Sequence, residues 1–152
     1  MCQSCLIVGE RLSLEDGAIE IQRMTAYLLV VERGRLASVS DVSRYARACE
    51  KERDTHGVRV MMVDARVDPS QTDPAAREAF WAWLAKKPFE RVAFVIDDEM
   101  MATELNMMAL SRRMQVRAFT TLGDAKTWAL SSGRLSAIPP PPDDPLEEAA
   151  EA

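Results

Sequence analysis

Three aspartates occupy positions where carboxylate chemistry is easily built. Asp64 follows the apolar run 58–63, and the pair Asp97-Asp98 follows the run 92–96. In a parallel sheet the carboxyl ends of the strands share one edge, so these side chains could converge and hold Mg²⁺ for phosphotransfer. The other interpretation is that they cap the next helix and keep a loop soluble. Because no phosphate-binding glycine loop or Walker lysine accompanies them, we favour capping and keep an Mg²⁺-dependent phosphotransfer enzyme as the weaker alternative.

Cysteine and histidine chemistry has little support in the sequence. Cys2 and Cys5 have the spacing of half a zinc site or of a redox pair, but Cys49 and His56 do not complete a standard second half. His56 is the only histidine, and it precedes Gly57, which is typical of a helix end. Neither a Gly-x-Ser-x-Gly nor a Gly-x-Gly-x-x-Gly pattern occurs. The inventory therefore argues against a hydrolase or a dinucleotide-binding enzyme, and we predict no cofactor.

Methionine and tryptophan are the more informative residues, with nine and three copies. Met100 and Met107 belong to a predicted helix that carries methionines on more than one face. Trp81 lies about 100° around its own helix from Phe80, off the centre of the core stripe. A flexible methionine surface beside an exposed Trp81 edge suits a partner-binding surface or an apolar pocket. A well-filled core is the alternative, and we favour it, because helices packed on a sheet bury wide faces.

Composition describes one globular domain with an acidic end. The 152 residues are 47% hydrophobic and 28% charged, with a formal net charge of −5. Residues 143–152 hold five acids and no base, which leaves 19 acidic against 19 basic residues in the rest. A neutral body argues against a nucleic-acid binder. We expect a domain over residues 1–133 and a Pro-rich, acidic, disordered tail over residues 134–152 that helps solubility.

The location expected from the sequence is the cytoplasm. The longest apolar run, 26–31, is far shorter than the roughly 20 residues of a membrane span, so no span is predicted. The first residues lack the basic region and the long apolar stretch of a secretory signal. Three cysteines, an odd number, agree with a reducing compartment.

Hydrophobic periodicity predicts the elements that would position these residues. Runs before residue 35 predict an antiparallel meander, whose first short run stops at Gly9. Helical and strand patterns then alternate, with helix starts at Ser38, Asp73-Pro74 and Thr121 and a third helix over about 100–114. We therefore predict an α/β fold, in which about four helices cover a four- to six-stranded, mixed, largely parallel sheet edged by the meander.

This order and some local sequence resemble the SpoIIAA-like, or STAS, family of bacterial regulatory domains. The resemblance covers about residues 18–130. It is strongest in the strand Val92-Ala93-Phe94-Val95-Ile96-Asp97. The closing stretch 116–130 resembles the family's last strand and its Trp-Leu helix, with Ala129 inserted between Trp128 and Leu130. Val63-Asp64 resembles the family's third strand end. These are packing motifs, so they bear on the fold more than on function.

The resemblance implies a non-enzymatic module that docks a protein partner, whose identity the sequence does not give. In such domains a Ser or Thr before the second helix is phosphorylated, and Ser70 and Thr72 lie in that region, although the Asp-Ser-x-Gly pattern is absent. We expect the partner surface to centre on Trp81, Met100 and Met107, and a homodimer is possible. The alternative that the resemblance leaves open is a carrier of a small apolar ligand or lipid between the second and third helices and the sheet.

Overall fold

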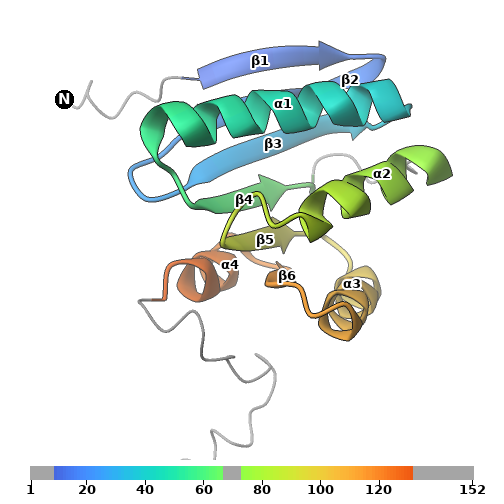
Figure 1. The fold of residues 1–152 in the computed structure, drawn as a ribbon. Coiled ribbons are helices and arrows are strands. Elements are labelled where there is room, and N and C mark those ends of the chain that lie inside the picture. Colours follow the sequence, from blue (N-terminus) through green and yellow to red (C-terminus); the bar gives the residue numbers. More distant parts are fainter. Residues whose placement is uncertain (1–8, 67–72, 132–152) are drawn as a thin grey trace, which may run out of the picture.

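The computed structural model describes residues 9–66 and 73–131, which form one six-stranded sheet with four helices (Figure 1). The predicted mixed α/β architecture is confirmed. Residues 134–152, predicted to be a tail, lie outside the described residues. The strands are β1 (Gly9–Leu14), β2 (Asp16–Arg23), β3 (Leu28–Arg35), β4 (Val60–Asp64), β5 (Arg91–Val95) and β6 (Val116–Phe119), and the helices are α1 (Val39–His56), α2 (Pro74–Ala85), α3 (Glu99–Ser111) and α4 (Leu122–Ala129).

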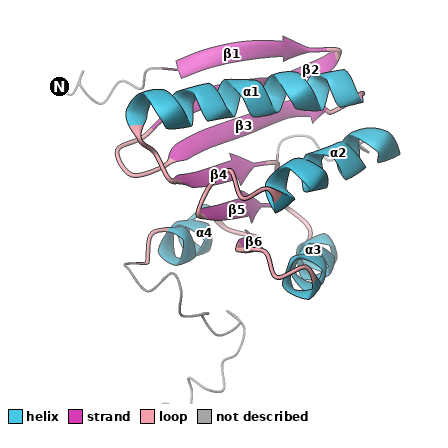
Figure 2. Ribbon diagram, viewed as in Figure 1, coloured by secondary structure: helices cyan, strands magenta, loops and turns pink. Residues whose placement is uncertain are grey.

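The strands lie in the sheet in the same order as in the chain. β1, β2 and β3 form the predicted antiparallel meander, and β3 to β6 are all parallel. α1 lies across β2 and β3 (Figure 2). Buried residues of α1, α2 and α3 share one cluster with the same face of the sheet, so all three crossover helices cover that face.

α4 alone covers the opposite face. Its Ala125 and Trp128 pack with Met62 and Val95 in a second, smaller cluster. α4 contacts β4, β5 and β6, and among the described helices none is paired in this way with the same face of the meander. That part of the sheet carries ion pairs instead, among them Arg11–Glu20 at 3.0 Å, Arg33–Glu20 at 3.2 Å and Arg35–Asp16 at 2.9 Å.

The predicted helix ends are confirmed by their capping contacts. The Ser38 side chain accepts a hydrogen bond from the Asp41 N–H, and α1 ends at Gly57 in the left-handed conformation. Asp73 accepts from the first-turn N–H groups of α2, with Pro74 at the first helical position. Thr121 caps α4 in the same way. Local sequence therefore determines where the helices begin.

Two predicted boundaries are wrong. The first strand does not stop at Gly9, because Gly9 is itself part of β1 and pairs with Gln22. The third helix ends at Ser111 rather than near Met114. Arg113 adopts a positive φ of 56°, and the Met114 N–H donates to the Ala109 carbonyl at 2.9 Å, which turns Met114 back into the core.

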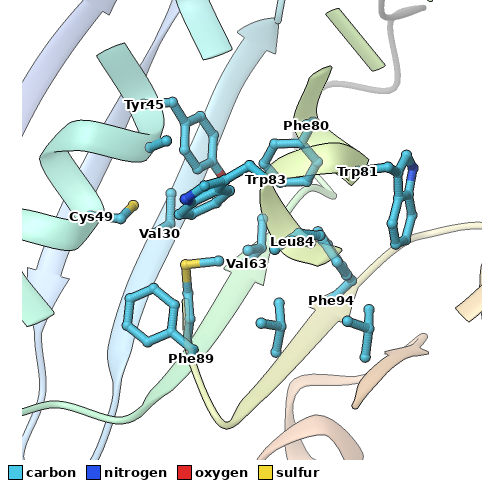
Figure 3. Close-up of a cluster of buried hydrophobic side chains, with 14 of the residues drawn as sticks. Val30, Tyr45, Cys49, Val63, Phe80, Trp81, Trp83, Leu84, Phe89 and Phe94 are labelled. Atoms are coloured by element: carbon cyan, nitrogen blue, oxygen red, sulfur yellow. The ribbon is translucent and has the colours of Figure 1, made fainter. Parts of the chain in front are cut away.

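An aromatic cluster joins α1, α2 and the sheet (Figure 3). The Tyr45 ring lies edge-on to Phe80 and Trp83, with centroid separations of 5.3 Å and 6.2 Å. The Tyr45 O–H donates to Glu32 at 2.7 Å, and the Trp83 N–H donates to Glu50 at 2.7 Å. Tyr45 and Trp83 therefore keep their polar atoms hydrogen-bonded, which offsets the cost of removing these atoms from water.

Asp41 connects the meander to α1. It is only 1% exposed, and its carboxylate accepts the N–H of Glu15 at 3.2 Å and the N–H of Ala37 at 3.0 Å. Both oxygens are used, so each holds a different loop against the start of the helix.

We expect Asp41→Asn to lower the free energy of unfolding by about 1–2 kcal/mol, because an amide can accept only one of the two N–H donors. Asp124→Asn is the matched control, since Asp124 is an exposed acid in the first turn of α4. Urea unfolding followed by circular dichroism measures both variants. Equal losses would mean that the helix dipole, and not the two loop contacts, accounts for the effect.

Candidate functional site

The strand-end aspartates do not form a shared site. Both carboxylate oxygens of Asp64 are bound by the Arg66 guanidinium, at 3.1 Å and 2.9 Å, and this contact lowers the pKa of Asp64. Asp98 caps α3 by accepting from the N–H groups of Met100 and Met101, at 2.9 Å and 3.1 Å. Asp97 is exposed. Within residues 9–66 and 73–131 no group of three or more acids, histidines or cysteines is arranged to hold a metal ion, so the phosphotransfer alternative is not supported.

The strand order gives a physical reason for this. Ligands of open α/β sheets bind where the strand order reverses and adjacent crossovers part to opposite faces. β3 to β6 run in sequence without a reversal, and their crossover helices all lie on one face. Within the described residues, the carboxyl edge therefore has no strand-order reversal beside Asp64 and Asp97.

Trp81 is buried, and the prediction of an exposed Trp81 edge is wrong. Its side chain is 7% exposed and lies over Phe94 of β5, with ring centroids 6.4 Å apart (Figure 3). Phe80, the adjacent residue, also contacts Phe94, at 6.1 Å. α2 therefore buries a wider stripe than the one centred on Phe80 and Trp83, and Trp81 belongs to the core.

The methionines of α3 lie on the surface instead. Met100 is 70% exposed, Met107 is 65% exposed and Leu110 is 67% exposed, and Met101 is also exposed. The favoured interpretation that these side chains fill the core is wrong. The fully buried residues of α3 are two alanines, Ala102 and Ala109, which bring the helix close to the sheet.

The exposed apolar side chains lie along one side of α3, with the exposed Thr103 and Glu104 between Met100 and Met107. Met107 is seven positions after Met100, which places the two within about 20° of each other around the helix, and Leu110 lies one turn further on, about 60° to one side. The buried alanines Ala102 and Ala109 repeat at the same spacing on the opposite side. We call Met100, Met107 and Leu110, with Met101 beside them, the α3 ridge. Leu110 was missed as a surface residue, although the alanine spacing could have identified it.

A recess of about 550 Å³ lies at the other edge of the sheet, where β4, β5 and β6 begin. Its lining includes the apolar residues Leu84, Phe89 and Val92 together with several charged side chains. An ion pair, Arg59–Glu90 at 2.6 Å, stands at its rim. The recess contains none of the α3 ridge residues, so it is separate from the surface that the methionines form.

Comparisons with known proteins bear on the fold alone. Neither a protein-family model nor a curated protein sequence matches the chain. Among solved structures, an uncharacterised protein from the DUF3478 family of Shewanella loihica PV-4, which has a SpoIIAA-like fold, superimposes with a TM-score of 0.57 at 20% identity. The match covers 77% of this chain and 96% of that protein. This chain has a SpoIIAA-like fold.

Two of the other candidate residues, Cys49 and His56, lie within the part of the chain that the structure describes. Cys49 is buried, and burial raises the pKa of its thiol, which disfavours the thiolate form that nucleophilic chemistry requires. His56 lies in the last turn of α1, where its ring contacts Arg23 and Glu52. None of the described helices combines the length and the apolar composition that crossing a bilayer requires. Cys2, Cys5, Ser70 and Thr72 lie outside the described residues.

Proposed function

We propose that this chain is a non-enzymatic bacterial regulatory module of STAS type, which acts in the cytoplasm by binding another protein through the α3 ridge. The observation that carries the proposal is the exposure of Met100, Met107 and Leu110 on one side of a helix whose opposite side is packed on the sheet. Exposed apolar ridges of this kind are typical of interaction surfaces, and methionine adapts to the shape of a partner. The SpoIIAA-like fold supports the same class of function.

Net charge is consistent with this mode of recognition. The excess of acids lies in residues 143–152, while the remaining charges balance. A domain whose charges balance has only a weak electrostatic field and does not attract a charged partner over long distances. Shape and apolar contact would therefore provide the selectivity for the partner.

We expect the double variant Met100→Gln/Met107→Gln to reduce recovery of the specific partner by roughly tenfold or more, because two apolar contacts at the centre of the surface are lost. Glutamine has a helix propensity close to that of methionine, so the fold should be kept. The measurement is quantitative mass spectrometry after affinity purification of cross-linked complexes.

Val39→Gln is the matched control, since Val39 is another exposed apolar side chain, 49% accessible, in the first turn of α1. Partners that are lost with the double variant and kept with Val39→Gln are assigned to the α3 ridge. An identical set of partners for wild type and for the double variant would contradict the proposed function.

A further inference from the structure

The two ends of α3 carry opposite charges. Asp97, Asp98 and Glu99 stand at its amino end, and Arg112 and Arg113 follow its carboxyl end. Within residues 9–66 and 73–131, none of these five side chains forms an ion pair shorter than 4.0 Å. The α3 ridge therefore runs between an acidic end and a basic end that are both exposed, although Asp98 also caps the helix and Asp97 interacts electrostatically with Arg66.

The spacing of these features is self-complementary. If a second α3 lies antiparallel on the first, the register that sets Met100 opposite Leu110 of the second copy also sets Asp97 opposite Arg113 of the second copy. Asp98 then faces Arg112 of the second copy. The two-fold axis then lies at the level of residue 105, although the Leu105 side chain itself packs on the core, and every contact occurs twice. A surface that is complementary to itself in one register is what a two-fold symmetric dimer requires.

We infer that the α3 ridge binds a second copy of this chain, with the two α3 helices antiparallel. This rests on the proposed function, since it names the partner of the same surface. Apolar contact along the ridge would supply most of the affinity, and the opposed charges at both ends would fix the antiparallel orientation. Antiparallel helices also set the positive end of one dipole beside the negative end of the other.

The expected dimer is weak. One helix per copy makes an interface at the small end of the range for specific complexes, so association should depend strongly on concentration. Added salt should weaken it further, because the end charges are exposed and screened.

Sedimentation velocity of the full chain from about 1 μM to about 500 μM tests the inference, with two charge-reversal variants. One is Asp97→Lys/Glu99→Lys, which leaves the capping Asp98 in place, and the other is Arg112→Glu/Arg113→Glu. Each variant alone should associate at least tenfold more weakly than wild type, because like charges meet at both ends. An equimolar mixture of the two should recover dimers. Circular dichroism confirms that both variants are folded.

Two results would overturn the inference. One is a wild-type chain that stays monomeric up to the highest concentration, and the other is a dimer that both charge variants form as well as wild type. In either case the proposed function is decided separately, by whether Met100→Gln/Met107→Gln loses its other protein partners. Loss of those partners from a monomeric chain would keep the proposed function and remove only the second copy as the occupant.

Discussion

Arg91→Ala is expected to lower the free energy of unfolding by about 3 kcal/mol, whereas Arg91→Met should cost less than about 1.5 kcal/mol. Arg91 is the first residue of β5, and its side chain is buried beneath α4 with 2% exposure. One guanidinium nitrogen donates to the Trp128 carbonyl and, at 2.6 Å, to the Ser131 hydroxyl. The guanidinium carbon lies 5.1 Å from the Trp128 ring centroid. Arg91 therefore holds the carboxyl end of α4 on the sheet.

The difference between the two substitutions follows from the surroundings of the cation. Burial lowers the pKa of Arg91, which records a cost of keeping the charge away from water. Its Nε has no hydrogen-bond partner within the described residues. Methionine removes that cost and still fills most of the space under Trp128, while alanine leaves a cavity and lets α4 loosen.

Chemical unfolding monitored by tryptophan fluorescence measures both Arg91 variants. Arg59→Ala is the control. Arg59 directly precedes β4, the strand that pairs with β5, and its side chain is 72% exposed, so its ion pair with Glu90 should contribute little to stability. If Arg91→Met destabilised the protein as much as Arg91→Ala, the hydrogen bonds and not the packing would be the main contribution of Arg91.

Gly34→Ala is expected to lower the free energy of unfolding by about 2–5 kcal/mol. Gly34 has a φ of +113°, and it stands directly opposite Gly17 where β2 and β3 pair. A Cβ at Gly34 would come within 2.5 Å of the Asp16 carbonyl oxygen and 2.6 Å of the Gly17 Cα. Both obstacles are backbone atoms, so the substitution adds a clash to the conformational strain, and the strands must separate.

Two other glycines separate the causes. Gly57→Ala introduces only the strain of a positive φ, because nothing lies within 4 Å of its Cβ, and it should cost about 1 kcal/mol. Gly123→Ala in α4 has open space and no positive φ, so it should stabilise the protein by about 0.5–1 kcal/mol. The same unfolding measurement ranks all three variants. A cost at Gly34 no larger than at Gly57 would contradict the close approach of β2 and β3.

The sequence predicts most of the fold because its signals are local. The helix ends are set by capping contacts within one turn, and the structure contains the ones predicted at Ser38, Asp73-Pro74 and Gly57. The alternation of strand and helix patterns predicts the parallel part of the sheet for the same reason. These signals depend on a few neighbouring residues and hardly on the tertiary environment.

The candidate surface was harder to predict because it depends on how far each helix sits from the sheet. Trp81 and Met107 have similar hydrophobic surroundings in the sequence, yet Trp81 is buried over Phe94 and Met107 is exposed. α3 packs on the sheet through Ala102 and Ala109. A prediction from hydrophobic periodicity gives these small residues less weight than the larger methionines. The burial of Arg91 also has no local signal, since it requires Trp128 and Ser131, far along the chain.

The order of the strands has a consequence for how the chain is assembled. Each strand pairs with the one synthesised just before it, so a chain that grows from its amino terminus can extend an existing sheet edge at every step. No strand must be inserted between two others that are already paired. A chain interrupted after any of β3, β4 or β5 would expose a parallel edge that the next strand normally covers.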